Sequence, residues 1–171
     1  MTEFKLNGVG DYELEVVGES YYQNSFEEIC GPRTDESVDL IVDAHLVPEP
    51  KNPHDPFAVR IDVQGKKVGY LPRETAKDYT ILLKALKIPI TTTLLVSGNI
   101  RGGWVRKGRK GNYGIWLDFP VDEYGAKQLK EIAKRTKKSW TPMLLKLTGG
   151  MIAICFLCIV VSVIMKALGI T

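Results

Sequence analysis

The sequence predicts a mainly β protein of the α+β class, folded as a small barrel or rolled sheet with one or two helices. Short stretches of alternating apolar and polar residues recur through the first part of the chain, separated by segments rich in Gly, Pro, Asn and Asp. A long uncharged apolar stretch lies near the C-terminus. We therefore expect three parts: a β-barrel domain over residues 1–121, a basic amphipathic juxtamembrane helix over 122–146 and a transmembrane helix over 147–168.

Strand patterns dominate up to residue 71. Residues 11–18 alternate apolar and acidic side chains before Gly18, and residues 38–47 form a second strand candidate. The following stretch, PEPKNPHDP, is dense in turn-forming residues and predicts a loop with tight turns. Residues 58–63 then alternate, QGKK supplies a turn, and residues 68–71 return as the partner strand, which predicts a β-hairpin.

The next segment is predicted to be a helix, and two further strands follow it. Pro72 suits an N-terminal helical position and the acidic Glu74 and Asp78 lie early, so we expect a helix over residues 73–86. The remaining expected elements are a β-branched strand at 90–100, a glycine-rich basic loop up to residue 114, a strand at 115–121 and the amphipathic basic helix from residue 122.

Charge is divided unevenly along the chain. Up to residue 80 there are 8 Lys and Arg against 16 Asp and Glu, whereas 15 basic and 4 acidic residues follow. A basic second half favours contact with something anionic, either lipid headgroups or nucleic acid. Five of its basic residues cluster in the glycine-rich loop and are expected to follow a phosphate backbone: Arg101, Arg106, Lys107, Arg109 and Lys110.

The apolar stretch predicts a membrane anchor. Residues 147–165 read LTGGMIAICFLCIVVSVIM without a charge, and a bilayer core of about 30 Å requires roughly 20 such residues as a helix. Basic residues are concentrated before this stretch, so the positive-inside rule places the N-terminal domain in the cytoplasm. The basic flank is expected to bind anionic lipid, and Trp140 to lie at headgroup level.

Patterns that would indicate catalysis are missing from the sequence. It contains neither HExxH nor GxSxG, and its glycines at 108, 111 and 114 do not form a phosphate-binding GxxxxGK[ST] motif. Of the three cysteines, Cys155 and Cys158 lie in the apolar stretch, where a CxxC spacing is better explained by packing than by a metal or redox site. We therefore expect no enzyme activity, no metal and no cofactor.

Two segments and their spacing resemble a known module. They are VVGESYYQNS at 16–25 and NPHDPFAVRIDVQGKKVGYLPRETA at 52–76. Over residues 11–120 the chain resembles a HIRAN domain, found in certain DNA-remodelling helicases and as a lone domain in bacterial proteins. The resemblance implies an OB-like or SH3-like barrel that binds single-stranded DNA and has a pocket for a free 3′-hydroxyl end. It also implies a bacterial plasma membrane as the site of the predicted anchor.

The resemblance implies a role for each matching residue. Tyr21 and Tyr22 match an aromatic pair that stacks on a base or lines its pocket, and Asp55 matches the acid that accepts a hydrogen bond from the terminal hydroxyl. Arg73 matches a phosphate contact. The other implied members are Asn52 and His54, which frame the loop of Asp55, Tyr70, on a strand facing the pocket, and Tyr113, at a further stacking position.

Other readings of these residues remain open. Asp55 in NPHDP suits an Asx turn, and adjacent tyrosines on a strand point to opposite faces, which would place one in the core. Ser20 stands where an arginine is expected from the resemblance, and the first half of the chain is acidic. The alternative to DNA binding is therefore a membrane-tethered, non-catalytic protein-interaction module.

Overall fold

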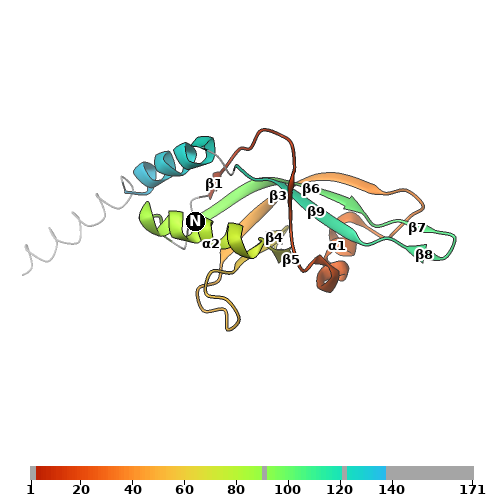
Figure 1. Cartoon of the computed structure of the whole chain (residues 1–171). Coiled ribbons are helices and arrows are strands. Elements are labelled where there is room, and N and C mark those ends of the chain that lie inside the picture. The colour runs from red at the N-terminus through yellow and green to blue at the C-terminus, as the bar shows by residue number, and fades with distance from the viewer. Residues whose placement is uncertain (1–2, 90–91, 121–122, 138–171) are drawn as a thin grey trace, which may run out of the picture. The chain divides into compact units, whose positions relative to one another are not determined.

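The computed structural model describes residues 3–89, 92–120 and 123–137 (Figure 1). The predicted transmembrane helix at 147–168 lies outside these residues, as does the predicted juxtamembrane helix beyond residue 137. Within the described ranges, no helix is both long enough and apolar enough to span a bilayer. The sheet and the helices that pack on it belong to a first compact unit, which ends at Ile132.

Most of the described strands form one seven-stranded sheet in the order β2-β9-β6-β3-β4-β5, with β1 paired to β6. Strands β3 and β6 are the longest and pair antiparallel from Val38 opposite Gly102 to Leu46 opposite Leu94. The bounds are β1 Glu3–Lys5, β2 Leu14–Glu15, β3 Val38–Pro48, β4 Val59–Val63, β5 Lys66–Tyr70, β6 Thr93–Gly102 and β9 Tyr113–Asp118. The predicted mainly β fold is confirmed.

The sheet is curled, and its two ends meet. Beyond β2, the backbone N–H of Val17 donates to the carbonyl of Tyr70 at 2.9 Å, and Tyr70 N–H donates back to Val17 at 3.0 Å. This pair joins the last residue of β5 to the segment that follows β2. Alternate residues of β4 and β6 face the interior, where Val59, Ile61 and Val96 are fully buried.

The structure corrects the predicted strand at 11–18. Only Leu14–Glu15 is a strand there, and the chain turns at Gly18, whose φ of 80° is left-handed. A 3₁₀ helix, η1 (Glu19–Tyr22), and helix α1 (Gln23–Cys30) follow. The two tyrosines are therefore not strand neighbours. Helix α1 was not predicted from the sequence, because it has only eight residues and buries a single side chain completely, Phe26.

Two longer helices follow the sequence pattern more closely. Helix α2 runs from Arg73 to Ala85, with Pro72 at its N-cap, as the predicted range 73–86 implies. A helix covers residues 123–137. The sequence predicted that this helix lies outside the barrel domain, which was expected to end at residue 121. Its first part instead belongs to the compact unit: Leu129 is buried, and the Gln128 amide exchanges two hydrogen bonds with the backbone of Asn7.

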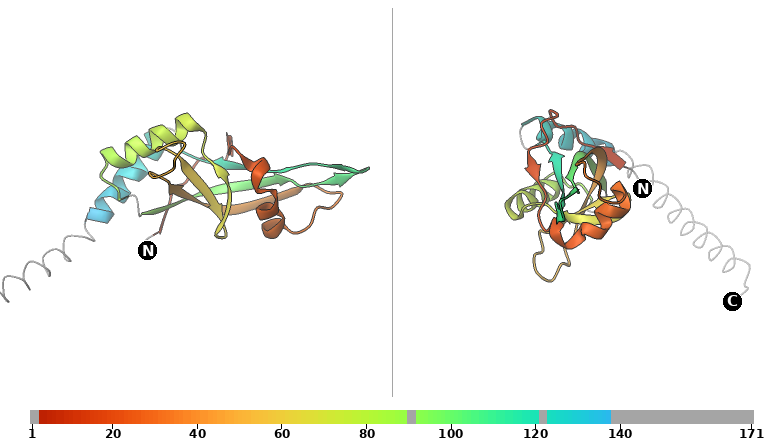
Figure 2. Two further views of the ribbon diagram at one scale, coloured as in Figure 1. Left: turned by 90° about the horizontal axis from the view of Figure 1, so that it is seen from below. Right: turned by 90° about the vertical axis from the view of Figure 1, so that its right-hand side faces the viewer.

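The predicted basic loop before residue 114 is a β-hairpin. Strands β7 (Val105–Arg106) and β8 (Arg109–Lys110) pair across a turn in which Lys107 and Gly108 both have positive φ. The hairpin continues β6 and β9 beyond the body of the sheet (Figures 1 and 2). The Val105 N–H donates to the Thr34 carbonyl at 2.6 Å, which ties its base to the segment between α1 and β3.

Candidate nucleic-acid interface

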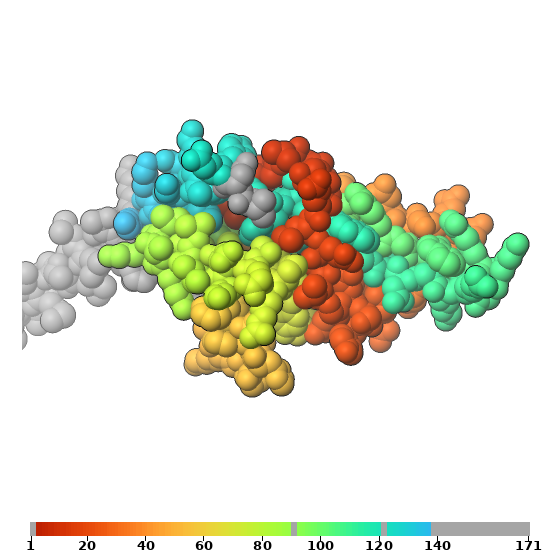
Figure 3. All heavy atoms as spheres, viewed as in Figure 1, coloured from red at the N-terminus to blue at the C-terminus, as the bar shows by residue number. Residues whose placement is uncertain are grey.

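An open groove of about 340 Å³ lies where three segments meet: the loop between β3 and β4, the end of β5 and the start of α2. In Figure 3 the loop projects as a yellow-orange segment below the yellow-green α2. Five of the eight predicted site residues line this groove. The complete lining is Val17, Asn52, His54, Asp55, Ala58, Tyr70, Leu71, Arg73 and Ala76.

Asn52 holds the loop in shape. Its side-chain oxygen accepts hydrogen bonds from the backbone N–H groups of His54 at 3.0 Å and Asp55 at 3.3 Å. Its amide nitrogen donates to Glu49 at 2.9 Å. The Glu49 N–H donates to the Ala58 carbonyl at 2.8 Å and closes the neck of the loop. The Asn52 side chain is therefore engaged with the loop itself, and its role is to position Asp55.

Asp55 uses one carboxylate oxygen within its own loop and has the other near Arg73. One carboxylate oxygen accepts the Phe57 N–H at 2.8 Å, which is an Asx turn. The other oxygen lies 3.5 Å from Nε of Arg73. The Asp55 side chain is 21% exposed, whereas that of Arg73 is 80% exposed. The second oxygen therefore faces the groove, and its ionic partner is a solvated guanidinium that can move away from it.

Tyr70 is fixed by charged residues that the sequence analysis did not select. Its hydroxyl donates to Glu49 at 3.1 Å and accepts from the Lys67 ammonium at 2.6 Å. Arg60 bonds the other oxygen of Glu49 at 2.7 Å. Burial alone would raise the pKa of Glu49, but hydrogen bonds from Asn52, Arg60 and Tyr70 outweigh it, so the pKa is lowered and the carboxylate stays charged.

Lys67 lies between two aromatic rings. Its ammonium is 4.3 Å from the ring centroid of Tyr70 and 5.0 Å from that of Tyr22. Burial would lower the pKa of Lys67, but hydrogen bonds to Tyr70 and Tyr22 raise it on balance. Tyr21, next along η1, is 86% exposed. Lys67 and Tyr22 thus lie near Tyr70, which lines the groove, whereas neither Tyr21 nor Tyr22 lines the groove itself. The signal for Lys67 in the sequence was its place immediately before VGYL, three residues from Tyr70 in the predicted hairpin.

Tyr113 is not available to a ligand, and its predicted stacking role must be corrected. Its side chain is 2% exposed, and its ring stacks on Phe26 with centroids 5.9 Å apart. The hydroxyl donates to the Gly31 carbonyl at 3.0 Å, and the Arg33 guanidinium lies 5.0 Å from the ring. Helix α1, which the sequence did not reveal, covers this tyrosine and makes it a core residue.

The β7–β8 hairpin forms a separate basic surface. Its side chains Arg106, Lys107, Arg109 and Lys110 are exposed, as is Arg101 at the end of β6. Two tryptophans lie among them, with Arg106 5.5 Å from the ring of Trp104 and Arg101 5.5 Å from that of Trp116. Exposed cations interleaved with aromatic rings are typical of surfaces that bind a phosphate backbone.

A family model described as the HIRAN domain matches residues 9–99, just over half of the 171 residues. The chain belongs to the HIRAN domain family. The predicted resemblance is thereby confirmed. The match contains η1, the loop of Asp55, β5 and α2, and it ends within β6. The β7–β8 hairpin and the helix at 123–137 of this HIRAN protein lie outside it.

One solved structure is also similar. It is the crystal structure of the HIRAN domain of human HLTF, with 18% sequence identity and a TM-score of 0.34. The similarity covers 69% of this chain and 84% of the HLTF domain. No curated protein sequence matches this HIRAN protein.

Proposed function

We propose that this HIRAN protein binds single-stranded DNA and holds a free 3′-hydroxyl end in the groove between the β3–β4 loop and α2. The observation that carries the proposal is the placement of Asp55, Tyr70 and Arg73 around one open groove. A carboxylate, an aromatic ring and a guanidinium are the groups that accept from a hydroxyl, contact a base and neutralise a phosphate.

Asp55 supplies the selectivity for the end. Its second oxygen accepts a hydrogen bond from a 3′-hydroxyl, whereas a 3′-phosphate at the same place would bring like charges together. Arg73 is exposed and its 3.5 Å contact with Asp55 is long for an ion pair, so the guanidinium can turn to the adjacent phosphate. The aromatic residues Tyr21, Tyr22 and Tyr70 offer stacking surfaces worth about 1–3 kcal/mol per base without demanding a sequence.

Membrane attachment belongs to the same proposal. The uncharged stretch at 147–165 and the basic residues before it support a single-pass anchor with the HIRAN domain on the cytoplasmic side. Extraction of membranes with alkaline carbonate tests this. The protein should stay in the membrane fraction, whereas release into the supernatant would show peripheral association only.

Fluorescence anisotropy with the full-length chain in mild detergent tests DNA binding. The probes are one short single-stranded DNA ending in a 3′-hydroxyl and the same DNA ending in a 3′-phosphate. We expect the hydroxyl end to bind about tenfold more tightly, the size of one charge-assisted hydrogen bond. Asp55→Asn keeps an acceptor for the Phe57 N–H while removing the charge, so it should reduce the preference between ends.

Two further variants complete the test. Asp55→Ala also removes the Asx turn and should weaken binding of both probes, while Asp11→Ala, an exposed acid away from the groove, should change nothing. Binding that is absent, or indifferent to the end and to Asp55, would contradict end capture. A tethered protein-interaction module would then be the function to pursue.

A further inference from the structure

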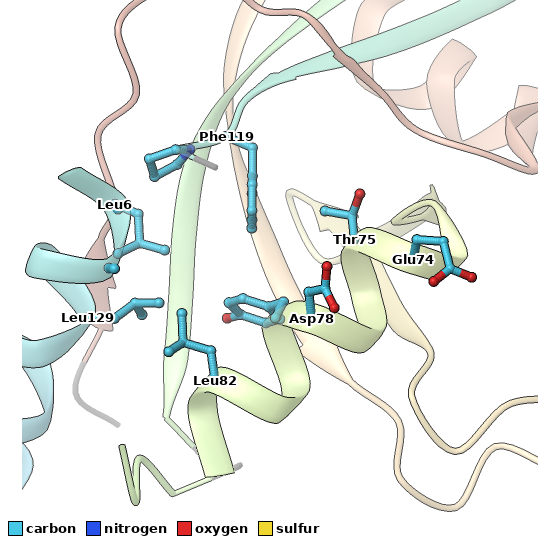
Figure 4. A pocket seen from close by; sticks show the side chains of 11 residues that line it. Leu6, Glu74, Thr75, Asp78, Leu82, Phe119 and Leu129 are labelled. Carbon is cyan, nitrogen blue, oxygen red and sulfur yellow. The ribbon is translucent and has the colours of Figure 1, made fainter. Parts of the chain in front are cut away.

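A second cavity, distinct from the groove, lies on another face of α2. It encloses about 290 Å³ between α2, the end of β9 and the helix that begins at residue 123. Figure 4 shows Leu6, Leu82, Phe119 and Leu129 directed into a common space from these separate segments. The volume is close to the lower end of small-ligand pockets, about 300 Å³. Nothing in the proposed DNA binding uses this cavity.

Tyr79 gives the cavity an unused hydrogen-bonding group. The residue lines the cavity and is 4% exposed, and its ring meets Phe119 edge-on at 5.8 Å. Its hydroxyl is buried without any hydrogen-bond partner in the part of the chain that the structure describes. Burial raises the pKa of this phenol, so the group stays protonated and can donate. A buried donor of this kind is costly unless something accepts from it.

The mouth of the cavity is acidic. Asp78 and Glu74 lie one turn apart on α2, with Thr75 beside Asp78 (Figure 4). Both acids are exposed, and neither side-chain carboxylate has an ion pair or hydrogen bond to another described residue. None of the described side chains that line the cavity is basic. The cavity therefore pairs an apolar interior and one phenol donor with a negative entrance, which fits a positively charged ligand.

We propose that this cavity binds a small aromatic amine that carries an oxygen at the far end of its ring. The ring lies among Leu6, Leu82 and Leu129, the oxygen accepts from the Tyr79 hydroxyl, and the ammonium lies beside Asp78 with Glu74 further out. Each part of the ligand matches one property of the cavity: the ring matches the apolar walls, the oxygen matches the unpartnered donor, and the ammonium matches the unpaired carboxylate. The inference does not depend on the proposed DNA binding.

Three small probe molecules differ from one another by single groups, and isothermal calorimetric titration of the full-length chain compares their affinities. Tyramine carries the ring, the oxygen and the amine; phenethylamine lacks the oxygen; 4-hydroxyphenylacetate replaces the amine by an acid. We expect one saturable site, with tyramine binding about five- to tenfold more tightly than phenethylamine because one hydrogen bond is lost. The acid should bind most weakly, since its charge meets Asp78 and Glu74.

Variants assign the binding to the cavity. Tyr79→Phe should remove the advantage of tyramine and leave phenethylamine unchanged, a thermodynamic cycle that isolates the hydroxyl. Asp78→Asn should weaken both amines about threefold, an effect that high salt reduces. Ala126→Leu places a larger side chain in the cavity and should abolish binding, while Glu13→Gln, an exposed acid outside the cavity, should have no effect.

Several outcomes would overturn the inference. These are no saturable binding by tyramine or phenethylamine, equal binding of the acid and the amine, and a tyramine advantage that survives in Tyr79→Phe. Tyr79→Phe removes only one oxygen and the fold is expected to tolerate it, so the cycle is informative even if Ala126→Leu fails to fold. The same titration with the Asp55→Asn variant distinguishes this cavity from the proposed DNA-binding groove, because the affinities of the amines should be the same as in the wild type.

Discussion

Two polar side chains, Gln23 and Glu19, connect the helical segment of η1 and α1 to the sheet. Gln23, the first residue of α1, uses both ends of its amide: its nitrogen donates to the carbonyls of Glu19 and Tyr113, and its oxygen accepts from Tyr113 N–H and Arg33. Glu19 accepts the Ile115 N–H at 2.5 Å. These bonds satisfy backbone groups at the start of β9 and hold η1, which carries Tyr21 and Tyr22, against the sheet.

Gln23→Ala should destabilise the domain by about 2–3 kcal/mol, because Tyr113 N–H and the Arg33 guanidinium lose their acceptor in a half-buried site. Urea unfolding followed by circular dichroism measures the change. Asn24→Ala, an exposed neighbour in the same helix, is the matched control and should alter stability little. Equal stabilities of the two variants would show that Gln23 does not hold η1 and α1 in place.

Glu19 should make stability depend on pH. Burial raises its pKa to about 7, with a smaller contribution from Glu15, although the hydrogen bond from Ile115 acts in the opposite direction. Between its unfolded pKa, near 4.5, and about pH 7 the folded state binds the proton more strongly than the unfolded state, so this residue lowers stability as pH rises through that window.

The test compares the wild type with Glu19→Gln by urea unfolding at pH 5 and pH 8. The variant should gain stability relative to the wild type at pH 8, and the gain should shrink at pH 5, where the wild-type carboxyl is protonated. A gain of the same size at both values would mean that titration of Glu19 is not the cause.

At the scale of elements, the closing contact between β5 and the segment after β2 shapes the groove. Val17 and Tyr70 both line it, and their paired backbones place the ring of Tyr70 beside the loop of Asp55. Gly69 allows this approach, because a Cβ there would lie 2.4 Å from a methyl of Val16 and 2.8 Å from the Val17 carbonyl.

Gly69→Ala should therefore separate β5 from Val17 and destabilise the domain by about 1–3 kcal/mol, the usual cost of overpacking. DNA binding should fall with it, since Tyr70 loses its backbone partner. Lys77→Ala on the exposed side of α2 serves as control for both measurements. Unfolding and anisotropy measurements that match the wild type would show that the closure tolerates a side chain.

The β7–β8 hairpin should add affinity without end selectivity. Replacing Arg106, Lys107, Arg109 and Lys110 by alanine should weaken both DNA probes equally. The slope of log K against log salt should become shallower by about 0.7 for each phosphate that the hairpin no longer neutralises. Anisotropy titrations at several salt concentrations give the slope. A changed preference between 3′-hydroxyl and 3′-phosphate would show instead that the hairpin touches the end itself.

At the scale of the whole molecule, the compact unit extends past the predicted barrel. The first part of the helix at 123–137 supplies Leu129 and Ile132 as buried residues, and it forms one wall of the α2 cavity. Helix α2 lines both hollows: Arg73 and Ala76 line the groove, whereas Asp78 and Tyr79 line the cavity. The groove and the cavity thus have no lining residue in common, although both are lined by α2.

Leu129→Ala should lower the free energy of unfolding by about 2–4 kcal/mol, as for a large-to-small change in a core. Lys130→Ala, exposed at the adjacent position, should have little effect. If Leu129→Ala is neutral in urea unfolding, the helix from residue 123 contributes little to the domain, and the boundary predicted at residue 121 is the better description.

Local pattern was sufficient for much of this protein. Strand β4 follows alternation of apolar and polar residues, β5 follows the turn before it, and β6 follows its β-branched residues. Helix α2 follows its N-terminal proline and acids, and the motifs from NPHDP to LPRETA predicted the family and five groove residues. These signals are local, because the period of apolar side chains, the turn residues and the spacing within a motif all depend on residues close together in the sequence. The Asx turn at Asp55 belongs with them.

Tertiary contacts decided the rest. Tyr113 is in the core because α1 lies over it, and Tyr70 faces the groove because Glu49, Lys67 and Val17, from separate segments, fix it there. The α2 cavity, which Tyr79 lines, forms because α2, the end of β9 and the helix from residue 123 come together. Whether a polar or aromatic side chain ends in a core, a groove or a cavity depends on which distant surface covers it, and single-sequence periodicity holds no information on that.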